Sequence, residues 1–163
     1  MRSIEVGKNY LEKQGYTVTV IISPVGDAYK KKDLLPAAQR IEILQLAAKN
    51  SDYIQVSDWE SKREEYTRTL LVLQHFSEEN PGVPVRLLCG SDLLESFNMP
   101  GVWADEDVMI INEFNFLVRI INNHLQMEAI VKDFGLIVLT RGDNIDSTIE
   151  ACKHLANYKV LMV

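Results

Sequence analysis

The chain has 163 residues, 47% hydrophobic and 25% charged, and its 17 Lys and Arg against 23 Asp and Glu give a formal net charge of −6. These proportions are typical of one soluble globular domain with enough apolar side chains for a core, and they exclude the low hydrophobicity and high net charge of a disordered chain. The acidic balance argues against nucleic acid as the main partner, and no apolar run is long enough to span a bilayer.

The chain opens with a helical pattern that is followed by a strand pattern. Ile4, Lys8 and Leu11 recur at helical spacing, and Gly15 ends that helix. The first 14 residues carry charges throughout, so no secretory signal peptide is expected. The run TVTVII, Thr17–Ile22, is β-branched and apolar, which predicts a buried strand.

Two further helices are predicted from their end signals. Pro36 suits the first turn of one helix. Ser61 as N-cap, with Glu64 three residues later, forms a capping box at the start of the next helix, which Asn80-Pro81-Gly82 ends. The apolar faces of the two helices are, in order, Ile41, Leu44 and Ala48, and Tyr66, Leu70, Leu73 and Phe76.

The remaining elements complete an alternation of strands and helices. They are strands at Tyr53–Val56, Val85–Cys89, Leu136–Thr140 and Lys159–Val163, and a helix through Ile145, Ile149 and Cys152. This alternation, with nearly continuous apolar strands, predicts an α/β fold with a doubly wound parallel sheet, in one domain over residues 1–163. Ligands bind outside the carboxyl ends of the strands in such sheets. We therefore expect the site in four segments: Ser23–Lys32, Asp58–Ser61, Gly90–Asp92 and Arg141–Asn144.

Basic residues follow two of the predicted strands. The run Lys30–Lys32, beside Tyr29, could place a lysine against a phosphate as a point charge, although a charge run is more often a solvated face. Arg141, directly after an apolar strand, could bind phosphate bidentately or form a structural ion pair. The residues alone leave both alternatives open.

Small, acidic and aromatic residues near the same strand ends are also compatible with a nucleotide. Gly90 would let a ligand approach the backbone closely. Asp92 could accept hydrogen bonds from a ribose hydroxyl or, like Ser91, cap the next helix. Three large aromatic residues offer faces for a planar ring, or else pack in the core or an interface: Trp59, Tyr66 and Trp103.

Metal and disulfide chemistry have little support. Cys89 and Cys152 make neither a disulfide framework nor a zinc spacing, and they fit a reducing compartment. His75, His124 and His154 are scattered and support no metal site. No nucleophile elbow or Walker loop is present. Composition and pattern thus lead to a nucleotide-binding type of α/β domain and no further.

Five strings of residues resemble a known family. They are IISPVGDAYKKKDL (Ile21–Leu34), VSDWES (Val56–Ser61), LLCGSDLLESF (Leu87–Phe97), VWADED (Val102–Asp107) and FGLIVLTR (Phe134–Arg141). In this order they closely resemble the eukaryotic nicotinamide mononucleotide adenylyltransferases. The resemblance implies a Rossmann-like nucleotidyltransferase fold. It also implies transfer of the adenylyl group of ATP, with Mg²⁺, to nicotinamide mononucleotide, giving NAD and pyrophosphate. The family commonly takes nicotinic acid mononucleotide too.

The same resemblance implies a set of binding residues. Tyr29 and Lys31 match substrate-loop positions that border the mononucleotide. Tyr66 stands where the family usually has a tryptophan that stacks on the pyridine ring, and Thr69, one turn further along the predicted helix, matches another pocket position. The other matches are Trp103 as the second stacking aromatic, Val102 as the backbone contact beside it, Gly90 and Asp92 at the ribose site, and Arg141 as a base or phosphate contact.

Departures at both ends bear on activity. The family opens with a strand and a GSFNP–H-x-x-H turn that binds the ATP phosphates, whereas Met1-Arg2-Ser3 aligns with the helix after that turn. The chain ends at Val163, before the place of the family's I-S-S/T-T-x-x-R motif. We therefore expect a fold without its first strand and its C-terminal helices, with no catalytic residue and no metal ligand retained. Exposed strand edges would leave it marginally stable and nearly inactive.

A third departure lies inside the chain. Trp103 and Arg141 are 38 residues apart, roughly twice the spacing in the family. The excess is about Met109–Gln126, where Ile and Asn make up eight of 18 residues. Because A/T-rich codons encode these residues, our hypothesis is a translated short intron, and a genuine helical insertion is the alternative.

Two functional hypotheses result. The first is an adenylyltransferase represented by an incomplete chain. The second is a catalytically inactive fragment or isoform that binds nucleotide weakly or associates with full-length subunits. A phosphopantetheine nucleotidyltransferase would leave the SPVGDAYKKK loop unexplained. Expected partners are ATP and the mononucleotide, without nucleic acid or membrane; a homo-oligomer stays open. The default location is the nucleus or cytoplasm, and a mitochondrial one is not excluded.

Overall fold

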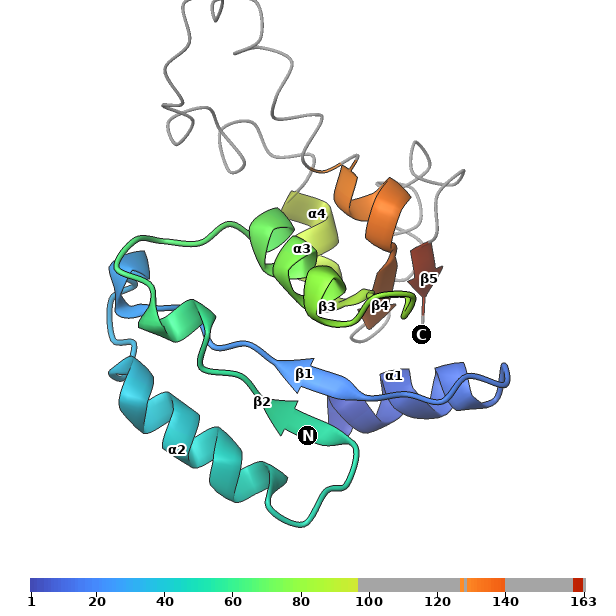
Figure 1. Ribbon diagram of the computed structural model, residues 1–163, viewed down its shortest axis with the longest axis horizontal. Helices are drawn as coiled ribbons and strands as arrows, with labels where there is room; N and C mark the ends of the chain where they lie inside the picture. The colour runs from blue at the N-terminus through green and yellow to red at the C-terminus, as the bar shows by residue number, and fades with distance from the viewer. Residues whose placement is uncertain (97–126, 128, 140–159, 163) are drawn as a thin grey trace, which may run out of the picture. The chain divides into compact units, whose positions relative to one another are not determined.

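The computed structural model describes residues 1–96, 127, 129–139 and 160–162 (Figure 1). The chain forms two compact units, an N-terminal unit, Met1–Val72, and a C-terminal unit, Leu73–Val163. The predicted helix through residues 145–152 and the atypical segment 109–126 lie outside the described residues. The single domain expected from the sequence stays a prediction.

The N-terminal unit is built on two short parallel strands. β1 (Val20–Ile22) pairs with β2 (Ile54–Val56) (Figure 1). In this pairing Val20 stands opposite Ile54. Backbone hydrogen bonds extend the ladder at both ends, from the amide of Val20 to Tyr53 O at 2.8 Å and from that of Ser57 to Ile22 O at 2.9 Å. Both predicted strands are confirmed, although the first one pairs only over its last three residues. Those three residues are half-buried, so the predicted burial of this strand is wrong.

Two helices accompany these strands. α1 (Arg2–Glu12) buries Gly7 and Leu11, and it ends before Gly15, whose φ of +88° is a conformation that glycine adopts without strain. The Lys8 ammonium lies 4.7 Å from the centre of the Tyr53 ring, at the start of β2. α2 (Ala37–Ala48) packs against β2 and buries its two end residues. Both helices were predicted from their apolar spacing and their end signals.

Pro36 precedes α2 rather than lying in its first turn. It occupies the N-cap position, and the amide of Ala37, the first helical residue, donates to Asp27 Oδ1 at 2.8 Å. A carboxylate from the loop that precedes α2 thus satisfies one of the amides that a helix start leaves without a helical partner.

The predicted capping box at Ser61 is wrong. α3 begins at Thr69 and ends at Glu79, so Tyr66 precedes the helix instead of lying on its face. Ser61 belongs to a short 3-10 helix, Glu60–Lys62, and its hydroxyl donates to Asp58 O at 2.8 Å. Arg63 is extended, with ψ of 140°. The hydroxyl that should cap a new helix therefore closes the preceding turn, and the chain stays irregular until Thr69.

The C-terminal unit contains a three-stranded parallel sheet in the order β3-β4-β5. Its strands are β3 (Leu87–Gly90), β4 (Leu136–Leu139) and β5 (Val160–Met162) (Figure 1). The central strand β4 is more buried than β3, since Leu136 and Val138 have no exposed surface. Buried apolar runs of this kind are expected in a parallel sheet that is covered on both faces.

Helical turns flank β3 and β4. α4 (Ser91–Ser96) begins directly after β3 and contacts both strands. A π-helix, Ile130–Phe134, precedes β4 and buries Ile130 and Val131. It ends at Gly135, whose φ is +87°. The α/β architecture with parallel strands is confirmed, and the described strands form two sheets. Among the described residues, no helix is both long enough and apolar enough to cross a membrane.

Candidate functional site

The carboxyl ends of β1 and β2 lead into two segments that touch each other. The first is the 23–35 loop (Ser23–Leu35) and the second is the 57–66 segment (Ser57–Tyr66). A Cβ atom on Gly26 would lie 3.2 Å from the backbone oxygen of Glu60 and 3.6 Å from that of Arg63. Because a methyl group would press on the backbone there, glycine permits this close approach.

Glu60 is a buried carboxylate between these segments. Its residue is 8% exposed, and the Ser23 hydroxyl donates to its Oε2 at 2.6 Å. Burial raises the pKa of the Glu60 carboxyl above its ordinary value of 4.5, while the Ser23 hydrogen bond and the charge of Arg40 oppose that shift. An otherwise costly buried group is thus stabilised by one hydrogen bond and one nearby cation.

Arg40 holds the 23–35 loop from the side of α2. Its guanidinium donates to Val25 O at 2.7 Å and to Leu35 O at 2.8 Å, and it lies 3.3 Å from Asp27 Oδ1. The two carbonyls are ten residues apart in the sequence, so one side chain fastens both arms of the loop. Asp27 in turn accepts the hydrogen bond from the first amide of α2.

Two tyrosines stack on each other, one from the middle of the 23–35 loop and one from the end of the 57–66 segment. The ring centres of Tyr29 and Tyr66 are 5.3 Å apart and their planes are inclined by 25°. These values fit an offset stack. The residues remain 46% and 45% exposed, so the pair still presents aromatic surface outward. Stacking on such a surface is one way to bind a planar heterocycle.

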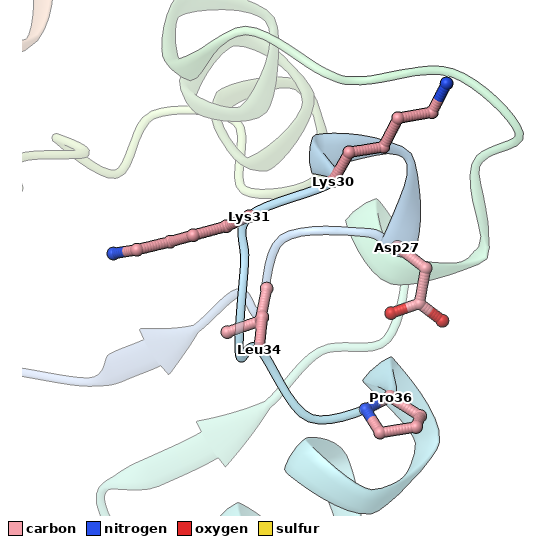
Figure 2. Close-up of a pocket in the computed structure, with 5 residues that line it drawn as sticks. All are labelled: Asp27, Lys30, Lys31, Leu34 and Pro36. Carbon is pink, nitrogen blue, oxygen red and sulfur yellow. The ribbon is translucent and has the colours of Figure 1, made fainter.

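A shallow cavity of about 220 Å³ lies between the 23–35 loop and the start of α2. Its lining residues are Asp27, Lys30, Lys31, Leu34 and Pro36 (Figure 2). The two lysine side chains extend in different directions from the loop, and the Asp27 carboxylate points toward the start of α2 (Figure 2). Lys30 adopts a φ of 50°, which turns the chain at this point. The exposed ammonium groups could attract a phosphate.

The other binding residues predicted from the sequence neither belong to the Tyr29–Tyr66 stack nor line the cavity, as far as the structure describes them. Thr69 is the first residue of α3 and is half-buried, and Trp59 carries the Arg63 guanidinium 5.0 Å from its ring centre. In the C-terminal unit, Gly90 ends β3 and Asp92 lies in the first turn of α4. A Cβ on Gly90 would collide with the Asp92 carboxylate, so a larger residue there would displace the Asp92 side chain.

Of the nine predicted binding residues, the structure brings Tyr29 and Tyr66 into contact and places Gly90 beside Asp92. Val102, Trp103 and Arg141 lie outside the described residues. The sequence analysis did not single out Ser23, Asp27, Arg40 or Glu60 individually. Ser23, Asp27 and Glu60 had a signal, since each lies in a segment that follows a predicted strand, whereas Arg40 lies outside these segments. Within the described part of the chain, no three His, Cys, Asp or Glu side chains are grouped to hold a metal ion.

Comparison with known proteins identifies the family. The family model described as cytidylyltransferase-like matches residues 1–151. The chain belongs to the cytidylyltransferase-like family. Cytidylyltransferase-like proteins use a Rossmann-like nucleotidyltransferase fold, with which the parallel α/β units described above are consistent.

The similar proteins within the cytidylyltransferase-like family are named nicotinamide/nicotinic acid mononucleotide adenylyltransferases. The chain is 38% identical to one from Oryza sativa subsp. japonica, over 95% of this chain and 59% of that protein. It is 35% identical to one from Arabidopsis thaliana, over 99% and 66% of the two lengths. It is 32% identical to nicotinamide/nicotinic acid mononucleotide adenylyltransferase 2 from Caenorhabditis elegans, over 97% of this chain and 68% of that protein. The resemblance expected from the sequence is confirmed, and the chain spans about 60 to 70% of these relatives.

Proposed function

We propose that this chain carries the mononucleotide-binding part of an enzyme that transfers the adenylyl group of ATP to nicotinamide or nicotinic acid mononucleotide. The observation that carries the proposal is the stacked pair of Tyr29 and Tyr66, which belong to the two chain segments that follow neighbouring parallel strands. The names of the relatives support it, because each states this activity.

In the proposed reaction a phosphate oxygen of the mononucleotide attacks the α-phosphorus of ATP. The bond between that phosphorus and the bridging oxygen breaks, and pyrophosphate leaves with the electron pair. Such a transfer depends on positioning and on charge stabilisation. Mg²⁺ bound to ATP would offset the negative charge on the phosphate oxygens of ATP.

The binding residues have separate roles in the proposal. Tyr66 and Tyr29 contact the pyridine ring by stacking, and Thr69 borders the same pocket. Lys31 supplies positive charge near the phosphate of the mononucleotide. The nucleotide ribose binds at Gly90 and Asp92. The proposal further includes Val102 and Trp103 beside the pyridine ring and Arg141 at a base or phosphate.

The test is NAD formation from ATP, Mg²⁺ and nicotinamide mononucleotide, measured by chromatography, together with mononucleotide binding by calorimetry. We expect the chain to bind the mononucleotide and Tyr66→Ala to weaken that binding. Tyr16→Ala, which changes an equally exposed tyrosine of the same unit, is the matched control. Binding without turnover would favour the alternative of a non-catalytic nucleotide-binding product. Absence of both would contradict the proposal.

A further inference from the structure

Glu60 holds the 23–35 loop at two points. Its side chain accepts a hydrogen bond from the Ser23 hydroxyl at 2.6 Å. Its backbone oxygen lies so close to Gly26 that a Cβ atom on that residue would be only 3.2 Å from it. The amide of Tyr29 then donates to Gly26 O at 3.2 Å. A short chain of contacts therefore runs from Glu60 through Gly26 to the stacking tyrosine.

Arg40, from α2, also fixes the 23–35 loop. Its side chain is only 14% exposed, and its bonds to Val25 O and Leu35 O span the segment that contains Tyr29. Asp27 joins this arrangement through Arg40 and through the first amide of α2. The loop is thus fastened at both ends, while the tyrosine between them remains exposed.

The proposed adenylyl transfer uses neither Glu60 nor Arg40. A buried carboxylate costs free energy unless hydrogen bonds and charge stabilise it, and a hydrophobic side chain could fill the space between two segments. The geometry of an aromatic stack, in contrast, depends on where the backbones that carry the two rings are held. The hydrogen bonds of Glu60 and Arg40 reach the loop at Ser23 and Val25, which precede Tyr29 by six and four residues.

The geometry points to Glu60 and Arg40 as positioning residues that hold Tyr29 against Tyr66 so that the pair accepts the pyridine ring of a mononucleotide. Neither residue touches the substrate in this arrangement; each acts through the 23–35 loop. The inference rests on the proposed function for its ligand and on the hydrogen bonds for its mechanism.

The test uses the whole chain with Glu60→Leu and Glu60→Gln. Leucine removes the acceptor for Ser23, whereas glutamine keeps an acceptor oxygen of similar reach. One readout is hydrogen exchange at the amides of Tyr29 and Lys30, which bond to Gly26 O and Asp27 O. The amides of Val20 and Ser57, in the β1–β2 ladder, report whether the unit stays folded. The second readout is the Kd for nicotinamide mononucleotide.

We expect Glu60→Leu to speed exchange at Tyr29 and Lys30 and to weaken mononucleotide binding, each by about tenfold, with the ladder unchanged. Glu60→Gln should restore both readouts. Arg40→Met should act like Glu60→Leu. Glu42→Leu, a change of an exposed acidic residue on α2, is the matched control and should leave both readouts unchanged. If Glu60→Leu does not fold, Ser23→Ala removes the same hydrogen bond with a smaller change.

The experiment distinguishes failure of the positioning role from failure of the proposed function. Binding that survives in Glu60→Leu and in Ser23→Ala would overturn the positioning role and leave the proposed function intact. Equal loss of protection in the loop and in the β1–β2 ladder would also overturn it, because the hydrogen bond would then only support the unit as a whole. A chain that binds no mononucleotide without any substitution would overturn the proposed function and the positioning role together.

Discussion

The hydroxyl of Ser23 donates a 2.6 Å hydrogen bond to Oε2 of Glu60, which is 37 residues away in the sequence. Ser23 follows β1 and Glu60 follows β2, so the bond joins the two chain segments that leave neighbouring parallel strands. The carboxylate is buried, and its pKa is raised mainly by that burial. The stability of the N-terminal unit should therefore depend on the ionisation of this one group.

The free energy of unfolding of the N-terminal unit should fall as Glu60 ionises. Because its pKa is higher in the folded chain than the ordinary 4.5, the contribution is fully present below pH 4.5 and is lost as the pH rises through the folded pKa. Glu60→Gln removes this titration, so its stability relative to the unmodified chain should increase over the same range. Urea unfolding at several pH values, followed by Trp59 fluorescence in a Trp103→Phe background, measures both. Parallel curves for the two proteins would contradict the prediction.

Replacement of Tyr66 should change mononucleotide affinity according to the size of its aromatic face. Tyr66→Ala removes the face that stacks on Tyr29 and should cost about 1–3 kcal/mol of binding free energy. Tyr66→Trp enlarges that face and should bind at least as tightly as the unmodified chain. Calorimetric titration with nicotinamide mononucleotide gives both values, and Tyr16→Ala is the control. Equal affinity in all four proteins would exclude stacking at this position.

Gly26→Ala should destabilise the N-terminal unit by steric contact. The φ of Gly26 is −70°, which alanine adopts readily, but the added Cβ would lie 3.2 Å from Glu60 O. Separation of the two backbones should cost about 1–3 kcal/mol and weaken the near-ultraviolet circular dichroism of the tyrosine stack. Gly15→Ala is an informative comparison, since its φ is +88° and no atom lies within 4 Å. That change should lower stability through backbone strain and leave the tyrosine signal intact.

Lys31→Gln should weaken mononucleotide binding more at low salt than at high salt. Lys31 lines the cavity beside the start of α2, and an exposed ammonium attracts a phosphate through a screened interaction. Lys32→Gln removes the same charge from the neighbouring residue, which does not line the cavity, and should have a smaller effect. Affinities measured at two ionic strengths test the difference. Identical losses in both variants would indicate a general effect of net charge.

Patterns within single elements were sufficient for much of the fold. The helical spacing of Ile4 and Leu11 before Gly15 predicted α1, and the β-branched run that ends at Ile22 predicted β1. The capping box at Ser61 failed although its spacing was right, because the Ser61 hydroxyl bonds to Asp58 O. Short-range patterns report what a segment can form, and the surrounding structure selects among the options.

The sequence by itself determined the parallel α/β class, the family and the two tyrosines of the proposed site. Only the tertiary structure decided that Tyr29 and Tyr66 stack, that Glu60 is buried on Ser23, and that Arg40 binds both arms of one loop. The reason is physical. Periodicity and motif strings are local, whereas the Tyr29–Tyr66 and Ser23–Glu60 contacts join residues that become neighbours only once β1 and β2 pair and their following segments meet.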